Sequence, residues 1–194
     1  MNMTASTWQK CLFLYKFIRF PKQIGSVTPS SKALAKKMVS SVPWDKVRHV
    51  AELGAGTGAV TKFIHEAGYP DTKVFLFEKE PVLRSRLAGE YPEYYCFPDA
   101  VQLDTAIRSK GVEQLDCVIS GLPFANFPQE IRDAIIGQVV KTLKPGGLFV
   151  AFQYSLQMKK QLARHFHIED IHFVMGNVPP AFVYVCRKKE RSSR

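Results

Sequence analysis

Residues 49–58 read HVAELGAGTG, a short apolar run that ends in an acid and a cluster of glycines. The apolar run favours a buried strand, and the glycines let the backbone turn sharply and come close to a ligand. Apolar residues then recur at helical spacing from Val60 to Ala67, and Gly68 supplies a stop. The stretch therefore predicts a strand, a glycine-rich loop and a helix, the unit that begins a Rossmann-like sheet.

Outward from this stretch, short apolar runs alternate with helical patterns, as expected of a mostly parallel sheet covered by helices. Pro81 can open one helix, and Ile131, Ile135, Val139 and Leu143 have the spacing of another. The sequence KPGG at 144–147 is expected to end that second helix and turn the chain into a strand. Seven strands are predicted, at 49–53, 73–77, 94–97, 116–120, 148–154, 171–175 and 182–187.

The last two predicted strands are separated by GNVPP at 176–180, which is too short for a crossover helix, so they should pair antiparallel. The predicted fold class is α/β, with a Rossmann-like seven-stranded sheet that is mostly parallel and ends in an antiparallel hairpin. At 194 residues, the chain is expected to hold one such domain, at 46–194, preceded by a basic, amphipathic lid segment at 1–45.

Acids lie at the ends of three successive predicted strands, at Glu52, Glu78 and Asp99. The glycines and Ala59 also fit the dinucleotide pattern G-x-G-x-x-G/A, but a carboxylate at Glu52 suits an ammonium group and is poorly placed beside a pyrophosphate. Glu78 is positioned to accept hydrogen bonds from both hydroxyls of a ribose, and Asp99 is positioned to accept one from the exocyclic amine of an adenine. Together these features predict S-adenosylmethionine as the cofactor.

The predicted cofactor site combines the three acids with the glycine loop and adjacent residues. Ala100 leaves room for the adenine ring beside Asp99. The cofactor-binding residues predicted in this part of the chain are Glu52, Gly54, Gly56, Thr57, Gly58, Glu78, Lys79, Asp99, Ala100 and Ser120.

Residues 120–124, SGLPF, follow the fourth predicted strand, where a doubly wound sheet presents its reactive crevice. A methyl transfer mainly requires the alignment of a nucleophile, and carbonyl oxygens on a turn stiffened by proline can accept the hydrogens of an amine. We expect the acceptor to meet Ser120, Gly121, Leu122, Pro123 and Phe124, with the Phe124 ring holding the methylated cation. The alternative is that the ring lies in the core.

Charge is unevenly distributed along the chain, whose formal net charge is +10. Residues 1–49 hold nine Lys or Arg and one acid, residues 50–155 ten and thirteen, and residues 156–194 eight and three. Basic flanks around a mildly acidic centre indicate a surface that faces an anionic partner, either lipid headgroups or nucleic-acid phosphate. The four cysteines and five histidines show no metal-ligand spacing, so no metal is expected.

The run 52–124 resembles amine methyltransferases related to the ribosomal RNA adenine dimethylases, whose acceptor motif reads Asn-Leu-Pro-Tyr or Asn-Leu-Pro-Phe. Gly121 stands where that family has asparagine, so it lacks the carboxamide that holds the adenine amine. A closer resemblance, over nearly the whole chain, is to the soluble bacterial phospholipid N-methyltransferases. It rests on IGSVTPSS at 24–31, the glycine loop, SGLP at 120–123 and NVPPA at 177–181.

This resemblance implies the class I methyltransferase form of the fold and the methylation of phosphatidylethanolamine toward phosphatidylcholine. By analogy with the dimethylases, residues 23–26 should fold over the cofactor, with Gln23 and Ser26 among its ligands. The hydroxyl of Ser30 is a further candidate to line the site, and the alternative is that Ser30 or Ser31 caps the helix that follows. The alternative functions are an RNA adenine N6-methyltransferase or another amine methyltransferase, and a non-catalytic module that uses the cofactor only structurally.

The segment 8–20 places bulky apolar and aromatic side chains beside a narrower polar side with Lys16 and Arg19. Such a helix can lie in a membrane interface; the alternative is a lid packed on its own domain. Tyr15, within it, is a candidate contact for the substrate amine or phosphate. With no signal sequence or long apolar span, we predict a cytoplasmic protein peripherally bound to the inner membrane face, with an anionic surface and phospholipid as partners in preference to RNA.

Overall fold

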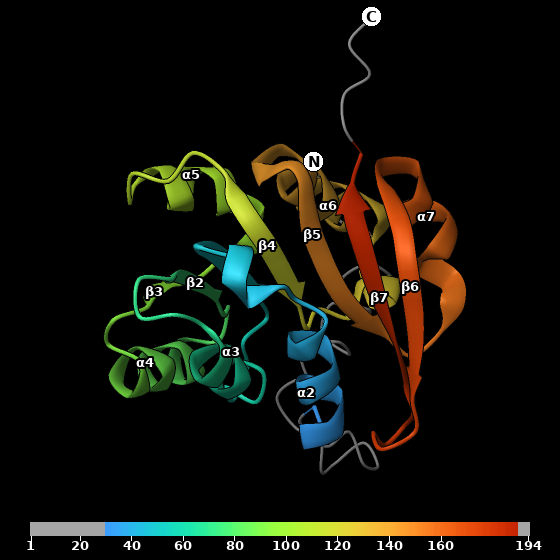
Figure 1. Cartoon of the computed structure of the whole chain (residues 1–194), viewed down its shortest axis with the longest axis horizontal. Helices are drawn as coiled ribbons and strands as arrows, with labels where there is room; N and C mark the ends of the chain where they lie inside the picture. The colour runs from blue at the N-terminus through green and yellow to red at the C-terminus, as the bar shows by residue number, and fades with distance from the viewer. Residues whose placement is uncertain (1–29, 190–194) are drawn as a thin grey trace, which may run out of the picture.

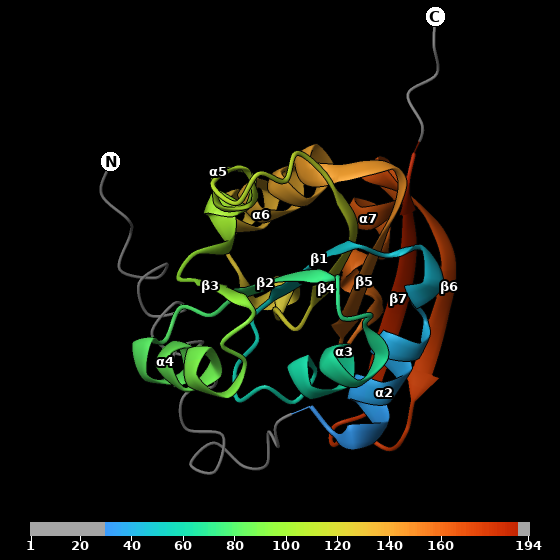
Figure 2. The ribbon, with the colours of Figure 1, turned by 60° about the vertical axis from the view of Figure 1, so that its left-hand side comes forward.

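The computed structural model describes residues 30–189, which form one seven-stranded sheet with helices on both faces (Figures 1 and 2). In spatial order the strands are β3-β2-β1-β4-β5-β7-β6. Strands β1 to β5 are parallel to their neighbours within that set, whereas β7 pairs antiparallel with both β5 and β6. This confirms the predicted fold class. The strand bounds are β1 His49–Leu53, β2 Lys73–Phe77, β3 Tyr95–Phe97, β4 Leu115–Ser120, β5 Leu143–Gln153, β6 Phe166–Val174 and β7 Ala181–Lys188.

Helices α2, α3 and α4 cover one face of the sheet and α5, α6 and α7 the other (Figure 2). Ser31 caps α2 by accepting a hydrogen bond from the Leu34 N–H at 3.1 Å, and Pro81 opens α4 as predicted. No helix within residues 30–189 is both long and apolar enough to cross a membrane. The helix bounds are α2 Lys32–Ser40, α3 Thr61–Ala67, α4 Pro81–Glu90, α5 Leu103–Arg108, α6 Gln129–Thr142 and α7 Lys159–His165, with 3-10 turns η1 Trp44–Lys46, η2 Ala100–Gln102, η3 Phe124–Asn126 and η4 Leu156–Met158.

Alternate residues of the central strands enter two separate cores. In β1, Val50 packs with α2 and α3, whereas Ala51 and Leu53 pack on the side of α5 and α6. Burial on both faces explains why these strands read as continuous apolar runs. Leu34 and Met38 of α2 are fully buried, so the described part of the predicted lid segment belongs to the core of the domain.

The register of the parallel strands brings their carboxyl ends to one edge of the sheet, called here the carboxyl edge. Leu53, near the end of β1, lies beside Phe77 of β2 and Ser120 of β4, and Phe77 lies beside Phe97 of β3. The loops that follow β1, β2, β3 and β4 therefore run side by side, where open α/β sheets bind their ligands.

The structure corrects the prediction for α6 and the start of β5. The helix ends at Thr142 and Leu143 already belongs to the strand, which starts earlier than predicted. The sequence KPGG forms an irregularity inside β5, where Gly146 has a φ of 72° and the pairing with β4 shifts. Ile131 is 42% exposed, so the buried side of α6 carries Ile135 and Val139 without it.

Strand β6 is also longer than predicted, since it starts at Phe166 instead of residue 171. Its pairing with β7 shifts between Ile168 and Asp170. The two adjacent acids at this irregularity, Glu169 and Asp170, interrupt the apolar alternation that marks a strand in sequence.

Candidate cofactor and acceptor site

The glycine loop after β1 is held against the end of β2. The N–H groups of Gly54 and Ala55 donate to the Phe77 carbonyl at 2.8 and 3.1 Å. Gly54 and Gly56 have φ values of 76° and 56°, which favour glycine. A Cβ at Gly54 would lie 2.7 Å from Leu122, whereas one at Gly56 would have no neighbour within 4 Å. Gly56 therefore presents bare backbone to open space, as close approach of a ligand requires.

Glu78, at the end of β2, ties this loop to the next one. Its Oε2 accepts from the Gly56 N–H at 2.7 Å and its Oε1 from the Glu80 N–H at 2.8 Å. The side chain is buried, yet a carboxylate has lone pairs beyond these two bonds. Glu78 therefore also holds the backbone of the two loops together, a role that the sequence did not reveal. Its remaining lone pairs leave it able to bind a ribose, as predicted.

Glu52 is a fully buried carboxyl whose one hydrogen-bond donor among the described residues is Thr61, at 2.7 Å from Oε2. The pKa of Glu52 is raised to about 8, mainly by burial. The charge of Glu78 also raises this pKa, and the hydrogen bond from Thr61 partly offsets the increase. Within residues 30–189 no Lys, Arg or His forms an ion pair with it. A buried acid without a cation, next to open glycine backbone, fits a positively charged ligand group.

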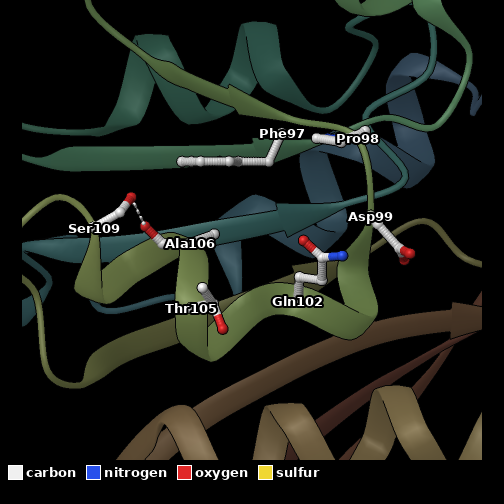
Figure 3. A pocket seen from close by; sticks show the side chains of 7 residues that line it. All are labelled: Phe97, Pro98, Asp99, Gln102, Thr105, Ala106 and Ser109. Carbon is white, nitrogen blue, oxygen red and sulfur yellow. Dashed lines mark hydrogen bonds between the residues drawn. The ribbon is translucent and has the colours of Figure 1, made fainter.

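Asp99 follows β3 and caps η2 by accepting from the Val101 N–H at 3.0 Å. Beside it is a pocket of about 240 Å³ between β3 and α5 (Figure 3). No residue of the glycine loop lines this pocket, which therefore lies to one side of that loop. The lining residues are Phe97, Pro98, Asp99, Gln102, Thr105, Ala106 and Ser109.

Of the remaining predicted cofactor residues, Gly58 and Ser120 are buried and three others are more exposed. Thr57 in the glycine loop and Lys79 after β2 have exposed side chains, and Ala100 at the start of η2 is half-buried. The Lys79 carbonyl accepts from Arg84 at 3.2 Å, which holds the backbone of this loop against α4. Tyr15, Gln23, Ser26 and the segment 8–20 lie outside the described residues.

The acceptor loop, residues 120–124, touches the glycine loop directly. The Gly121 N–H donates to the Leu53 carbonyl at 2.8 Å, and a Cβ at Gly121 would lie 3.0 Å from the Gly54 carbonyl oxygen. Ser120 is buried and its hydroxyl accepts from the Leu122 N–H at 3.2 Å. Any side chain at Gly121 would therefore require the two loops to move apart.

Gln153, the last residue of β5, was missed by sequence reasoning. Its side-chain amide donates to the Leu122 carbonyl at 2.9 Å and accepts from the Ala125 N–H at 3.2 Å. The Phe124 N–H donates to the same Leu122 carbonyl at 2.9 Å, so this oxygen is already fully used. A buried amide at the end of the apolar run LFVAFQ was the one available signal.

The ring of Phe124 lies in the core. Its side chain is 1% exposed and packs edge to face with Phe127 and Phe149, at ring separations of 6.2 and 6.1 Å. The expectation of an accessible aromatic face at this position is therefore wrong, and the alternative of a core ring holds in this structure. The backbone of the loop, in contrast, stays beside Gly54.

Metal ligands are not grouped in the described part of the chain, where no three His, Cys, Asp or Glu side chains come together as a site. Cys117 and Cys186 are buried, and burial raises the pKa of the Cys186 thiol to about 12. These thiols pack as apolar side chains.

No family model matches the chain. The ornithine lipid N-methyltransferase of Singulisphaera acidiphila is 35% identical over 187 residues, which span 93% of this chain and 97% of that protein. The ribosomal RNA small subunit methyltransferase A of Maridesulfovibrio salexigens is 37% identical over 89 residues, or 45% of this chain and 33% of that protein. Its Streptococcus thermophilus counterpart is 25% identical over 88% of this chain and 57% of that protein.

Solved structures share the fold at low sequence identity. The 1,6-didemethyltoxoflavin-N1-methyltransferase of Burkholderia thailandensis, bound to S-adenosylhomocysteine, has a TM-score of 0.72 at 15% identity, over 98% of this chain and 93% of that one. The N-methyltransferase NodS of Bradyrhizobium japonicum, also with S-adenosylhomocysteine, has a TM-score of 0.70 at 14% identity, over 93% and 99%. The chain therefore belongs to the family of class I S-adenosylmethionine-dependent N-methyltransferases that includes the S. acidiphila ornithine lipid enzyme.

Proposed function

We propose that this N-methyltransferase acts on the primary amine of a membrane phospholipid, with phosphatidylethanolamine as the acceptor, at the surface of the bilayer. The observation that carries the proposal is the match to a lipid N-methyltransferase, which spans 93% of this chain. Gly121 supports it, because glycine lacks the carboxamide with which adenine dimethylases hold a base, and a Cβ at this position would lie only 3.0 Å from the Gly54 carbonyl oxygen.

S-adenosylmethionine supplies an electrophilic methyl group, and the residues of the carboxyl edge fit its parts. Glu52 would neutralise the methionyl ammonium, because it is the buried acid that has no cationic partner among the described residues. The open backbone at Gly56 would face the cofactor, Glu78 would accept from the ribose hydroxyls, and Asp99 would accept from the adenine amine.

The acceptor amine would be oriented by the Ser120–Gly121 end of the acceptor loop. Both lone pairs of the Leu122 carbonyl are occupied, and the Pro123 carbonyl accepts from the Asn126 N–H at 2.9 Å. Within residues 30–189 the Gly121 carbonyl accepts no hydrogen bond, and it lies where the two loops meet. No base is needed in this arrangement if the amine loses its proton when it leaves water, because desolvation favours the neutral form.

Glu78→Ala should weaken the binding of S-adenosylhomocysteine by about 1–3 kcal/mol, because it removes the ribose contact and the acceptor that fixes the Gly56 N–H. Titration calorimetry measures this loss. Glu80→Ala is the matched control, since the Glu80 side chain caps α4 by accepting from the Leu83 N–H, whereas the Gly56 N–H donates to Glu78. Unchanged affinity in Glu78→Ala would remove Glu78 from the site.

Gln153→Leu should lower kcat/KM for the amine acceptor roughly tenfold to a hundredfold while cofactor affinity stays within about a factor of two, because small shifts of a positioned loop are costly. The leucine cannot hold the Leu122 carbonyl or the Ala125 N–H. Gln138→Leu is the control, because the Gln138 side chain also accepts from a backbone N–H, but that of Asp104 in α5 and not one of the acceptor loop. Equal kinetics in the two variants would refute the role of Gln153.

The proposed substrate is tested with cofactor labelled on its methyl group. Separate reactions contain vesicles with phosphatidylethanolamine, vesicles with ornithine lipid, and ribosomal RNA, and the label is counted in each extract. We expect label in phosphatidylethanolamine. Label in ornithine lipid alone would reject a phospholipid acceptor and keep a membrane lipid as the substrate. Label in RNA alone would refute the proposal of a lipid substrate.

RNA adenine methylation is the second candidate. The 89-residue match to the M. salexigens ribosomal RNA enzyme and the basic flanks favour it. Gly121 speaks against it, because glycine offers no side chain to hold a base.

A further inference from the structure

The tip of the β6–β7 hairpin lies at the carboxyl edge, next to the acceptor loop. Gln153, which holds that loop, is paired with Phe182 of β7, and Phe182 is paired with Phe173 of β6. Beyond these pairs the chain turns through residues 175–180. The antiparallel order of β7 and β6 therefore directs their connection to the side of the sheet where the substrate amine would arrive.

The tip lies beside the start of α2 (Figure 1) and is hydrogen-bonded to the residue that caps this helix. The Ser31 N–H donates to the buried side chain of Asn177 at 2.9 Å, and the amide of Asn177 donates to the Pro179 carbonyl at 2.8 Å. A Cβ at Gly176 would lie 3.0 Å from that of Ala33. These contacts hold the tip against the start of α2.

The tip exposes large apolar side chains. Phe173 is 54% exposed, Met175 77% and Val178 59%, and we call these three residues the tip surface. They make up three of the seven exposed large apolar side chains found in residues 30–189, within a span of six residues. Leu156 of η4, which follows the carboxyl end of β5, is a further exposed apolar residue, at 47%. Exposed apolar groups concentrated at one edge mark an interaction site.

The segments around the tip surface are basic. Residues 30–44, 153–168 and 171–189 contain no Asp or Glu. Lys32 and Lys36 of α2 are exposed, and so are Lys159 and Lys160 at the start of α7. No ion pair with an acid is formed by these four lysines within the described part of the chain. Exposed apolar side chains beside the lysines of α2 match the interface of an anionic bilayer.

We propose that the hairpin tip is a membrane-docking element, with the tip surface inserted among the headgroups of an anionic bilayer and the neighbouring lysines at the level of the phosphates. This inference rests on the proposed lipid substrate and adds the orientation of the enzyme. With the tip in the interface, the acceptor loop faces the lipid surface, so an amine headgroup reaches it without leaving the bilayer. The enzyme would therefore bind its lipid substrate while docked on the bilayer and would not have to extract the lipid into water.

The test uses the full chain and vesicles of phosphatidylethanolamine with phosphatidylglycerol. Met175→Ser with Val178→Ser should weaken co-sedimentation about a hundredfold, since each large apolar side chain lost from lipid costs about a factor of ten. The matched control is Val82→Ser with Ile131→Ser, two apolar residues that are 71% and 42% exposed on α4 and α6. The control should bind vesicles as the parent does, and both double variants should keep their affinity for S-adenosylhomocysteine.

Equal vesicle binding by the tip variant and the parent would overturn the docking proposal. So would loss of cofactor affinity in the tip variant, which would make the tip a part of the core, or a change of its mass in solution without vesicles, which would make the occupant a second copy of the chain. The substrate proposal fails separately: vesicle binding that depends on the tip, with no label in any lipid, would keep the docking surface and reject the substrate.

Discussion

Gly56→Val should abolish measurable binding of S-adenosylhomocysteine while the protein still folds. Nothing lies within 4 Å of a Cβ at Gly56, so the new side chain would extend into the space where we propose that the cofactor binds. The backbone cost is separate, because Gly56 has a φ of 56° and a branched side chain is strained there by on the order of 1–3 kcal/mol. Titration calorimetry and thermal unfolding measure the two effects independently.

The matched control is Gly111→Val. Gly111 has a φ of 71° and also has no atom within 4 Å of its Cβ position, but it lies in the turn between α5 and β4, away from the carboxyl edge. We expect both variants to lose similar stability and only Gly56→Val to lose the cofactor. Normal binding by Gly56→Val would mean that the glycine loop is not the cofactor site.

Glu52→Gln should weaken the binding of S-adenosylmethionine at least tenfold, about 1.4 kcal/mol, because an amide cannot neutralise a buried ammonium. Calorimetry at pH 7 checks this loss. Asp104→Asn serves as the control: it removes one negative charge from a carboxylate that is paired with Lys141 and Arg108 and lies outside the site. Equal cofactor affinity in Glu52→Gln and the parent would exclude Glu52 as the partner of the cation.

The same substitution should change how stability depends on pH. Burial raises the pKa of Glu52 from its ordinary value of 4.5 to about 8. Between these values the unfolded chain has lost this proton and the folded protein retains it, so the free energy of unfolding falls as pH rises, by on the order of 5 kcal/mol in all. The stability that the folded protein gains from keeping this proton is complete below pH 4.5 and is lost above about pH 8.

Glu52→Gln removes this titration, so the difference in stability between the variant and the parent isolates it from other groups. We expect Glu52→Gln to gain stability relative to the parent as pH rises from 5 to 9 in urea unfolding series. A difference that does not vary with pH would show that the carboxyl is ionised in the folded protein. A buried acid that destabilises the free protein is the kind of compromise found at functional sites, which agrees with the role proposed for Glu52 as the partner of a cation.

The sheet was largely predictable because its central strands are buried on both faces. The runs at 49–53 and 73–77 have the bounds of β1 and β2, since apolar residues on both sides leave no ambiguity about where a strand ends. β5 and β6 were harder, because each begins beside an irregularity: the glycines at 146–147 and the acids Glu169 and Asp170 read as loop, and only pairing with β4 and β7 makes them strand.

The candidate site was predictable where glycines and acids follow strands, because the sheet brings such loops together. Two features depended on tertiary contacts. Phe124 reads as a ring at a reactive loop, but Phe127 and Phe149 enclose it, and no local pattern reports that packing. Gln153 reads as a polar residue at a strand end, and its hydrogen bonds to Leu122 and Ala125 arise only when β4 and β5 are adjacent.

Mass spectrometry of membrane lipids tests the central claim most directly. The full chain and Gly56→Val are expressed separately in a bacterium that makes phosphatidylethanolamine and no methylated lipid, and the lipids and ribosomal RNA of both cultures are analysed. We predict phosphatidylethanolamine heavier by one or more methyl groups with the parent chain alone. Unchanged lipids together with new methyl groups on ribosomal RNA would contradict a lipid N-methyltransferase.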